Sequence, residues 1–142
     1  KVPGTAIYRN LENHPEGETY PGLLILRFDG TLFYANTPNH MTAIRNAIAA
    51  AEPTPKVVLL DGESMNGIDA TAVISLKELQ EQLAKSGIEI RLARMKSEVL
   101  AVIERAGLPK TIPEDHYYPS VQAGVDAYLA EFGMSAVSEE NR

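Results

Sequence analysis

The sequence predicts a single α/β domain with a mixed, mostly parallel sheet of about five strands, an N-terminal β-hairpin and four to five helices. Three observations support this prediction. Residues 57–60 are four consecutive apolar residues, which is typical of a strand buried on both faces in a parallel sheet. After residue 36, segments of helical periodicity alternate with strand-like segments, and this order favours right-handed crossovers between parallel strands. The length of 142 residues is that of one domain.

The composition excludes several classes of protein. Apolar residues make up 44% and charged residues 23% of the chain, as in ordinary globular domains. No apolar run approaches the ~18 residues needed to cross a bilayer. The absence of cysteine excludes disulfides, thiolate catalysis and cysteine-ligated metals. A net charge of −6 argues against nucleic acid as a partner. Because the chain begins with Lys1 rather than Met, we expect it to be part of a longer protein.

The first third of the chain predicts three strands and a helix. Residues 5–9 are β-rich and suit an edge strand, and residues 10–21 suit an exposed connection. Residues 23–28 form a second predicted strand. Asp29-Gly30 is a strong hairpin signal, so residues 32–35 are expected as a third, antiparallel strand. Thr37 suits a helix N-cap followed by Pro38 at the first helical position.

The middle of the chain predicts a strand, a loop and a helix. The buried strand at residues 57–60 is followed by a polar segment with Gly62 and Gly67, which we interpret as a loop. Asp69 is the expected N-cap of a helix over residues 70–86. Apolar residues of this helix recur at helical spacing, and we expect Gln80 on the opposite, solvent-facing side.

The last third predicts one strand and two helices. Residues 88–93 alternate in polarity, as expected for a strand with one packed face. Ser97 is the predicted N-cap of a helix that ends at Gly107. Another is predicted from the N-cap Ser120, ending at Gly133. The polar residues 134–142 lack periodicity and suit a flexible tail.

No pattern in the sequence predicts catalysis. The histidines, His14, His40 and His116, are not at metal-ligand spacing. Residues 62–67 come close to the G-x-S-x-G motif, but the second glycine falls one place late. Neither a dinucleotide-binding glycine motif nor a phosphate-binding lysine motif is present. We therefore expect no enzymatic activity, no cofactor and no metal.

Two interpretations of Asp69 and Thr71 remain open. Asp69 can be a structural N-cap whose carboxylate accepts hydrogen bonds from the first turn of the helix. Thr71 would then place its hydroxyl at the positive end of the helix dipole, a position that suits an anion or a phosphate. The negative charge of Asp69 would repel a phosphate two residues away. A switch that reads a charge added at Thr71 could use this repulsion.

The buried strand, the polar segment and Asp-Ala-Thr-Ala at a helix start resemble the signature of STAS domains (sulfate transporter and anti-sigma factor antagonist). In the antagonists the helix opens with Asp-Ser-Ser-Gly, and the second Ser accepts phosphate from a partner kinase. The resemblance makes Thr71 the equivalent of this phospho-acceptor, while Ala70 and Ala72 replace Ser and Gly. The interaction loop that it implies consists of Gly67, Ile68, Asp69, Ala70 and Thr71.

A second set of motifs resembles the cytoplasmic tail of SulP-type (sulfate permease-like) anion permeases. These motifs are Val2-Pro3-Gly4-Thr5 and the segment PGLLILRFDGTLFYANT at residues 21–37. The resemblance implies a STAS domain at residues 1–133, with a linker at 1–5 from an upstream membrane domain and a flexible tail at 134–142. It also implies a non-catalytic regulatory domain on the cytoplasmic face of the membrane, in a secondary transporter of sulfate, bicarbonate or a related anion. The implied partners are the membrane domain of the same transporter and a second copy, in a homodimer of the full-length protein. The domain would support assembly, dimerisation or gating.

Two alternative functions are also consistent with the resemblance. The first is a stand-alone anti-sigma factor antagonist, which binds a regulatory protein and is switched by phosphorylation at Thr71. The second is a sensor of a nucleotide or another small ligand, because ligands of parallel sheets bind at the carboxyl ends of the strands. We expect that rim to contain Asn36, Thr37, Arg94 and Met95 beside the interaction loop.

Overall fold

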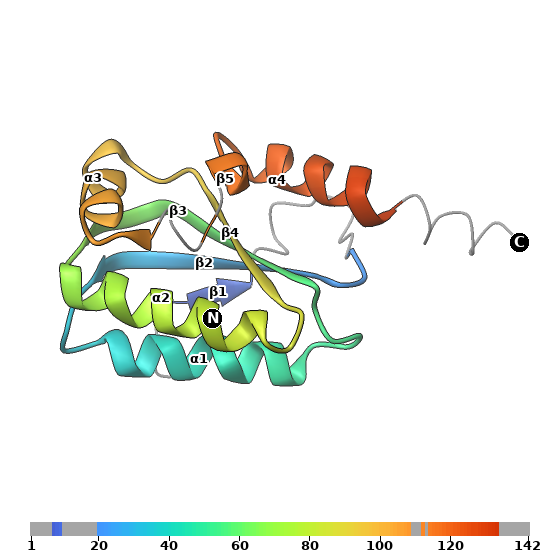
Figure 1. Cartoon of the computed structure of the whole chain (residues 1–142), viewed down its shortest axis with the longest axis horizontal. Coiled ribbons are helices and arrows are strands. Elements are labelled where there is room, and N and C mark those ends of the chain that lie inside the picture. The colour runs from blue at the N-terminus through green and yellow to red at the C-terminus, as the bar shows by residue number, and fades with distance from the viewer. Residues whose placement is uncertain (1–6, 10–19, 109–111, 113, 134–142) are drawn as a thin grey trace, which may run out of the picture.

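Strands and helices alternate along the computed structural model of the chain, which describes residues 7–9, 20–108, 112 and 114–133 (Figure 1). A 3₁₀ turn, η3 (Glu114–His116), precedes the last strand, and a π-helical turn, η4 (Leu129–Gly133), extends the last helix. The five strands and four α-helices of the described residues are β1 (Ile7–Arg9), β2 (Leu23–Leu32), α1 (Thr37–Ala50), β3 (Val57–Ile68), α2 (Ala70–Ala84), β4 (Glu89–Ala93), α3 (Ser97–Arg105), β5 (Tyr117–Tyr118) and α4 (Val121–Tyr128).

The strands form one mixed sheet in the order β1-β2-β3-β4-β5. β1 pairs antiparallel with β2, whereas β2, β3, β4 and β5 are parallel to their neighbours. The helices α1, α2 and α3 connect the parallel strands, as crossover connections require. These features confirm the predicted α/β class with a mixed, mostly parallel sheet.

The predicted hairpin at Asp29-Gly30 is wrong. β2 continues through these residues to Leu32 and stays parallel to β3 along its whole length. The register between the two strands shifts on either side of Asp29 and Gly30, and Gly30 has a φ of +85°. Gly30 therefore permits a local irregularity within a continuous strand rather than a chain reversal. The antiparallel pair at the start of the chain is instead β1 with β2.

The predicted polar loop after residue 60 is also wrong, because β3 runs without interruption from Val57 to Ile68. The extensions of β2 and β3 pair with each other, so each supplies the backbone hydrogen bonds of the other. In the extension of β3 every third residue is buried, namely Gly62, Met65 and Ile68, while Glu63 and Asn66 are exposed. The spacing departs from strict alternation because the register between β2 and β3 shifts twice along this stretch, so the polar residues between the buried ones fit a half-exposed, irregular strand.

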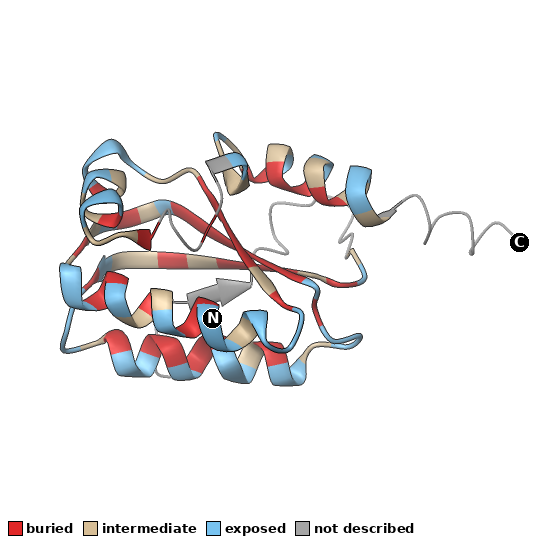
Figure 2. Cartoon of the chain, in the orientation of Figure 1, coloured by how far each residue is buried: buried red, intermediate tan, exposed pale blue. Residues whose placement is uncertain are grey.

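Helices cover both faces of the sheet and enclose two apolar cores (Figures 1 and 2). The larger core lies between the sheet and α1, α2 and α3, and it contains Ile44, Val73 and Leu76. The smaller core lies under α4 and contains Leu59 and Val125. In the apolar run of β3, Val58 and Leu60 belong to the larger core and Leu59 belongs to the smaller one, which explains why the run has no polar residue.

Two polar residues have surroundings that differ from the prediction. Gln80, expected to face water, is 7% exposed, and its side-chain oxygen accepts a hydrogen bond from the backbone N–H of Ile90 at 2.9 Å. Arg91 is 1% exposed, so β4 is packed on both faces and not on one.

Some predicted segment boundaries differ from the structure, and others fall outside the residues that it describes. α2 ends at Ala84 rather than at residue 86. Ser97 is the first residue of α3 and not its N-cap, which is Lys96. The predicted linker at residues 1–5 and the predicted tail at residues 134–142 lie outside the described residues.

Candidate functional site

Asp69 joins the start of α2 to the loop that follows β2. Its Oδ1 accepts a hydrogen bond from the backbone N–H of Ala72 at 2.7 Å, which confirms its predicted role as N-cap. Its Oδ2 accepts a second hydrogen bond, from the backbone N–H of Tyr34 at 2.9 Å. The backbone N–H of Asp69 in turn donates to the carbonyl oxygen of Leu32. Both carboxylate oxygens are therefore engaged with the backbone.

Asn36 and Thr37 shape the loop between β2 and α1. The side-chain oxygen of Asn36 accepts from the N–H of Phe33 at 2.9 Å, and its amide nitrogen donates to the carbonyl of Thr31 at 2.8 Å. Thr37 is buried, and its hydroxyl donates to the carbonyl of Phe33 at 2.6 Å. Asn36, not Thr37, is the N-cap residue of α1 by position, and Pro38 follows within the first turn. The polar atoms of both side chains thus contact their own loop.

Thr71 is exposed in the first turn of α2, two residues after the N-cap. Ala70 is also exposed, Gly67 is partly buried, and Ile68 is buried at 8% exposure. No acidic residue follows Asp69 in the first turn of α2. Thr71 is therefore an exposed residue at the positive end of the helix dipole.

Arg94 lies at the end of β4 and is paired with carboxylates of β3. Its Nε donates to Asp61 Oδ1 at 3.0 Å, its Nη2 donates to Asp61 Oδ2, and its Nη1 lies 2.8 Å from Glu63 Oε2. Hydrogen bonding to Asp61 raises the pKa of Arg94, against the effect of partial burial, and the charges of Asp61 and Glu63 add to the increase. Arg94 adopts a φ of 54°, in the left-handed region that is rare for a residue with a side chain.

The predicted rim is therefore divided into two parts. Asn36 and Thr37 lie beside Asp69 through the contacts of the β2–α1 loop. Arg94 instead contacts Asp61 and Glu63, and the side chain of Met95 occupies the space above Gly62. An anion at Arg94 would have to compete with two carboxylates for the guanidinium group.

Three exposed apolar side chains were missed by the sequence analysis. Phe33 and Tyr34 follow β2, with exposed fractions of 38% and 69% and ring centroids 5.8 Å apart in an edge-to-face arrangement. Ile74 of α2 is 50% exposed, and it lies one turn beyond Thr71 on the same face of the helix. The sequence predicts residues 32–35 as a third, antiparallel strand, whereas β2 ends at Leu32 and the two aromatic residues lie in the loop that follows it.

A second missed feature is a charged cluster centred on Arg91. Its Nη2 lies 3.0 Å from Oε2 of both Glu89 and Glu131, and its Nη1 lies 3.4 Å from the hydroxyl of Tyr118. Burial disfavours the charged guanidinium, yet the hydrogen bonds to Glu131 and Glu89 outweigh it and raise the pKa of Arg91. The cluster ties η4 to β4. The only sequence signal for this cluster is the alternating polarity of residues 88–93.

Neither a metal centre nor a membrane span is found in the described part of the chain. No three His, Cys, Asp or Glu side chains within those residues are arranged to hold a metal ion. None of the helices seen there is long and apolar enough to cross a bilayer.

Comparisons with known proteins agree on one family and one fold. Residues 14–124 match the STAS domain family. The chain is 31% identical to a probable sulfate transporter 4.2 of Arabidopsis thaliana and 30% identical to a probable sulfate transporter of Mycobacterium tuberculosis. These matches cover 88% and 89% of this chain but only 20% and 23% of the relatives. The chain thus spans about a fifth of the length of the curated relatives it matches.

Solved structures show the same fold. The anion transporter SLC26A9 matches over 95% of this chain and 24% of its own, with a TM-score of 0.76 and 18% identity. The STAS domain of a SulP transporter from Vibrio cholerae matches over 87% of this chain and 94% of its own, with a TM-score of 0.68 and 22% identity. An unphosphorylated anti-sigma factor antagonist gives a TM-score of 0.60 at 17% identity, over 80% of this chain and 93% of its own.

Proposed function

We propose that this chain, which belongs to the STAS domain family, is the C-terminal cytoplasmic domain of a SulP-type anion transporter. Its role is regulatory and non-catalytic: it supports assembly, dimerisation or gating of the membrane domain of the same polypeptide. Transport of sulfate, bicarbonate or a related anion would belong to that membrane domain. Residues 1–133 would form the STAS domain, with a linker at its start and a flexible tail after it.

One observation carries the proposal. The relatives at 30% identity or more are named as sulfate transporters, and this chain matches only about a fifth of each. A domain of this size with no catalytic motif, attached to a transporter, suits regulation rather than chemistry. The interaction loop from Gly67 to Thr71 and the adjoining β2–α1 loop are the candidate contact surface.

The experiment has two steps. Sequencing the gene upstream of Lys1 should reveal several apolar spans of ~20 residues. The full-length protein, reconstituted in vesicles, should take up a labelled anion, and the variant that lacks residues 1–142 should show lower uptake at equal amounts of inserted protein. A gene without apolar spans, or uptake unaffected by the deletion, would contradict the proposal.

A second candidate function is an antagonist switched by phosphate at Thr71. Its support is the exposure of Thr71 in the first turn of α2, next to the Asp69 cap, together with the fold shared with anti-sigma factor antagonists. Phosphorylation would add a charge of about −1.5 to −2 beside Asp69 and weaken the contacts of this carboxylate. Incubation with candidate kinases and ATP, followed by mass spectrometry, would test it, with Thr71→Ala as the control. An unmodified Thr71 under conditions that phosphorylate a known antagonist would count against it.

A further inference from the structure

Asn66 is a residue of β3 that has no partner in β2. Gly30 pairs with Met65 and Thr31 pairs with Gly67, so the register shift between these pairs leaves Asn66 as an extra residue. An extra residue of this kind is unpaired and interrupts the ladder of backbone hydrogen bonds. Figure 1 shows β2 and β3 side by side as they run toward the starts of α1 and α2, and the irregularity lies in this last part of both strands.

Asn66 is also exposed to solvent. Within the described residues its side-chain amide makes no hydrogen bond that would hold it in place. The next residue is Gly67, which has no Cβ to hinder the approach of its backbone nitrogen to the side chain before it. In an unhindered Asn-Gly pair this nitrogen can attack the side-chain amide and close a succinimide ring. Sequence, exposure and the interrupted strand pairing therefore all favour this reaction at one position.

Two dipeptides of similar form, Asp29-Gly30 and Asp61-Gly62, lie in the same two strands but are held by arginines. Asp61 is 0% exposed, and its Oδ1 accepts a hydrogen bond from Arg94 Nε at 3.0 Å. The Oδ1 atom of Asp29 lies 3.4 Å from Arg27 Nε. A carboxylate paired with a cation resists attack by a nucleophile, because it carries a negative charge and a fixed orientation. The amide of Asn66 has neither, so the structure singles out Asn66 among the three.

From these observations we propose that Asn66 is a site of spontaneous deamidation in the folded protein. The backbone nitrogen of Gly67 loses its proton and attacks Cγ of Asn66, so that a new C–N bond forms. The bond from Cγ to Nδ2 breaks, and ammonia leaves with the proton. Water then opens the ring at one of its two carbonyl carbons and gives aspartate or isoaspartate at position 66. The reaction consumes only water, so this inference is independent of the proposed function.

The two products differ in their effect on the interaction loop. Aspartate keeps the course of the backbone and adds one exposed negative charge. Isoaspartate carries the backbone through the former side chain and lengthens it by one methylene group, three residues before Asp69. The backbone N–H of Asp69 donates to the carbonyl of Leu32 at 3.1 Å, and its Oδ2 accepts from the N–H of Tyr34 at 2.9 Å. The longer backbone should displace Asp69 from these partners.

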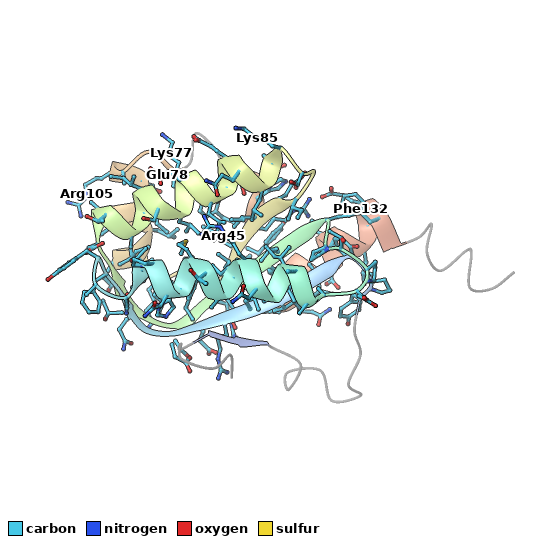
Figure 3. The ribbon with its side chains drawn as sticks, turned by 90° about the horizontal axis from the view of Figure 1, so that it is seen from below. Arg45, Lys77, Glu78, Lys85, Arg105 and Phe132 are labelled. Atoms are coloured by element: carbon cyan, nitrogen blue, oxygen red, sulfur yellow. The ribbon has the colours of Figure 1, made fainter. Side chains whose placement is uncertain are left out.

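Peptide mapping of the purified protein tests the proposal. The folded protein is incubated at mildly alkaline pH, and conversion at each asparagine is measured by mass spectrometry after digestion at acidic pH, which prevents conversion during the analysis. Asn66 should convert at least tenfold faster than Asn39 and Asn46, two exposed asparagines of α1 that precede residues with side chains. Asn46 directly follows Arg45, which Figure 3 labels on α1.

A second incubation in urea gives the rate of the unfolded chain. Conversion of Asn66 in urea but not in the folded protein would overturn the proposal. Conversion of Asn39 or Asn46 as fast as that of Asn66 would also overturn it, because the bulge and the glycine would then select nothing.

Gly67→Ala tests the attack by the backbone nitrogen. A Cβ at this position would lie 3.6 Å from Thr31 Cγ2 and 3.9 Å from Thr31 Oγ1, which is ordinary contact, so the strand accommodates the methyl group. The methyl group hinders ring closure, and conversion of Asn66 should slow at least tenfold. Unchanged conversion in Gly67→Ala would overturn the mechanism.

Asn66→Gln is a second variant that does not alter the glycine. Its longer side chain would have to close a larger ring, so position 66 should stay unmodified over the same incubation. Conversion at position 66 as fast as in the wild type would contradict ring closure at Asn66. Circular dichroism establishes that each variant is folded.

Hydrogen exchange measures the effect of the modification on the interaction loop. Protein enriched in isoaspartate at position 66 should exchange the backbone amide of Tyr34 at least tenfold faster than fresh protein, because this amide loses its bond to Asp69. Asn66→Asp, which adds the charge alone, should leave the rate unchanged. The backbone amide of Ala123, bonded to Ser120 in α4, is the internal control. Equal exchange of Tyr34 in the fresh and the isoaspartate forms would refute the displacement of Asp69.

Discussion

The carboxylate of Asp69 accepts a hydrogen bond from the backbone N–H of Tyr34, a residue 35 positions earlier in the chain, at 2.9 Å. Because the other carboxylate oxygen caps α2 at Ala72, one side chain connects two loops that follow neighbouring parallel strands. The shape of the candidate interaction surface therefore depends on a residue that would otherwise be an ordinary helix cap.

Replacement of Asp69 should cost more stability than replacement of a cap with one contact. Asp69→Ala loses a cap worth ~1 kcal/mol and a further hydrogen bond to a backbone N–H of about 1 kcal/mol. Ser120 caps α4 through one hydrogen bond, from the N–H of Ala123 at 3.0 Å, and Ser120→Ala is the matched control at about 1 kcal/mol. Urea unfolding of both variants measures the difference. Equal losses would mean that the contact with Tyr34 contributes nothing.

A side chain at position 22 should destabilise the protein as long as Tyr128 carries its hydroxyl group. Gly22 has a φ of +84°, and an added Cβ would overlap the hydroxyl of Tyr128, which donates to the carbonyl of Pro21. Gly22→Ala should therefore cost about 1–2 kcal/mol for backbone strain and a further ~1–3 kcal/mol for the overlap. Gly87 has a φ of +76° with nothing within 4 Å of an added Cβ, so Gly87→Ala reports the strain alone.

A double-mutant cycle isolates the overlap at Gly22. In a Tyr128→Phe background the hydroxyl is absent, and the cost of Gly22→Ala should fall to that of Gly87→Ala. The free energy of unfolding of the four cycle variants is measured by urea titration. An unchanged cost in the Phe background would assign the whole effect to the backbone.

The two carboxylates around Arg91 should be coupled. Arg91 is 1% exposed, whereas Glu89 and Glu131 are about half exposed, at 46% and 48%. Either glutamate alone can neutralise the buried guanidinium, so Glu89→Ala or Glu131→Ala should each cost about 1 kcal/mol. The double variant leaves a buried charge unpaired and should cost ~3 kcal/mol or more. If the loss of stability in the double variant equalled the sum of the losses in the two single variants, Glu89 and Glu131 would not share the neutralisation of Arg91.

Tyr117 should make the protein sensitive to alkali. Burial raises the pKa of Tyr117 to about 12 from its usual 10.0, with a further contribution from Glu104. In the unfolded chain the hydroxyl ionises at lower pH than in the folded chain, so stability should fall as the pH rises from about 10 to 12. Tyr117→Phe should remove this part of the pH dependence.

The same variant should cost little at pH 7, because within the described residues the buried hydroxyl of Tyr117 has no hydrogen-bond partner. Thermal melting of the wild type and Tyr117→Phe from pH 8 to 11 provides the comparison. A marked decrease in the melting temperature of Tyr117→Phe at neutral pH would mean that the hydroxyl of Tyr117 does make a hydrogen bond.

Local signals in the sequence determined the fold class, the family resemblance and the N-caps of α2 and α4, but not those of α1 and α3. Asp69 and Ser120 were predicted as N-caps and accept the expected backbone hydrogen bonds, because capping depends on residues within one turn. The apolar run at 57–60 predicted a strand buried on both faces, since its composition reports burial directly. The parallel strands followed from the alternation of helices and strands, whereas the mixed character was predicted from a hairpin at Asp29-Gly30 and is due instead to the pairing of β1 with β2.

Only the tertiary structure decided where the strands end and what surrounds the polar residues. Asp29-Gly30 is a turn signal, but the long partner strand β3 supplies hydrogen bonds that keep β2 extended past it. Arg91 and Gln80 are buried because distant groups satisfy them, namely Glu131 and the backbone of Ile90. Phe33, Tyr34 and Ile74 are exposed for the opposite reason, since no element of the described domain covers them. Pairings between residues far apart in the chain leave no periodic mark on a single sequence, so local patterns could not reveal them.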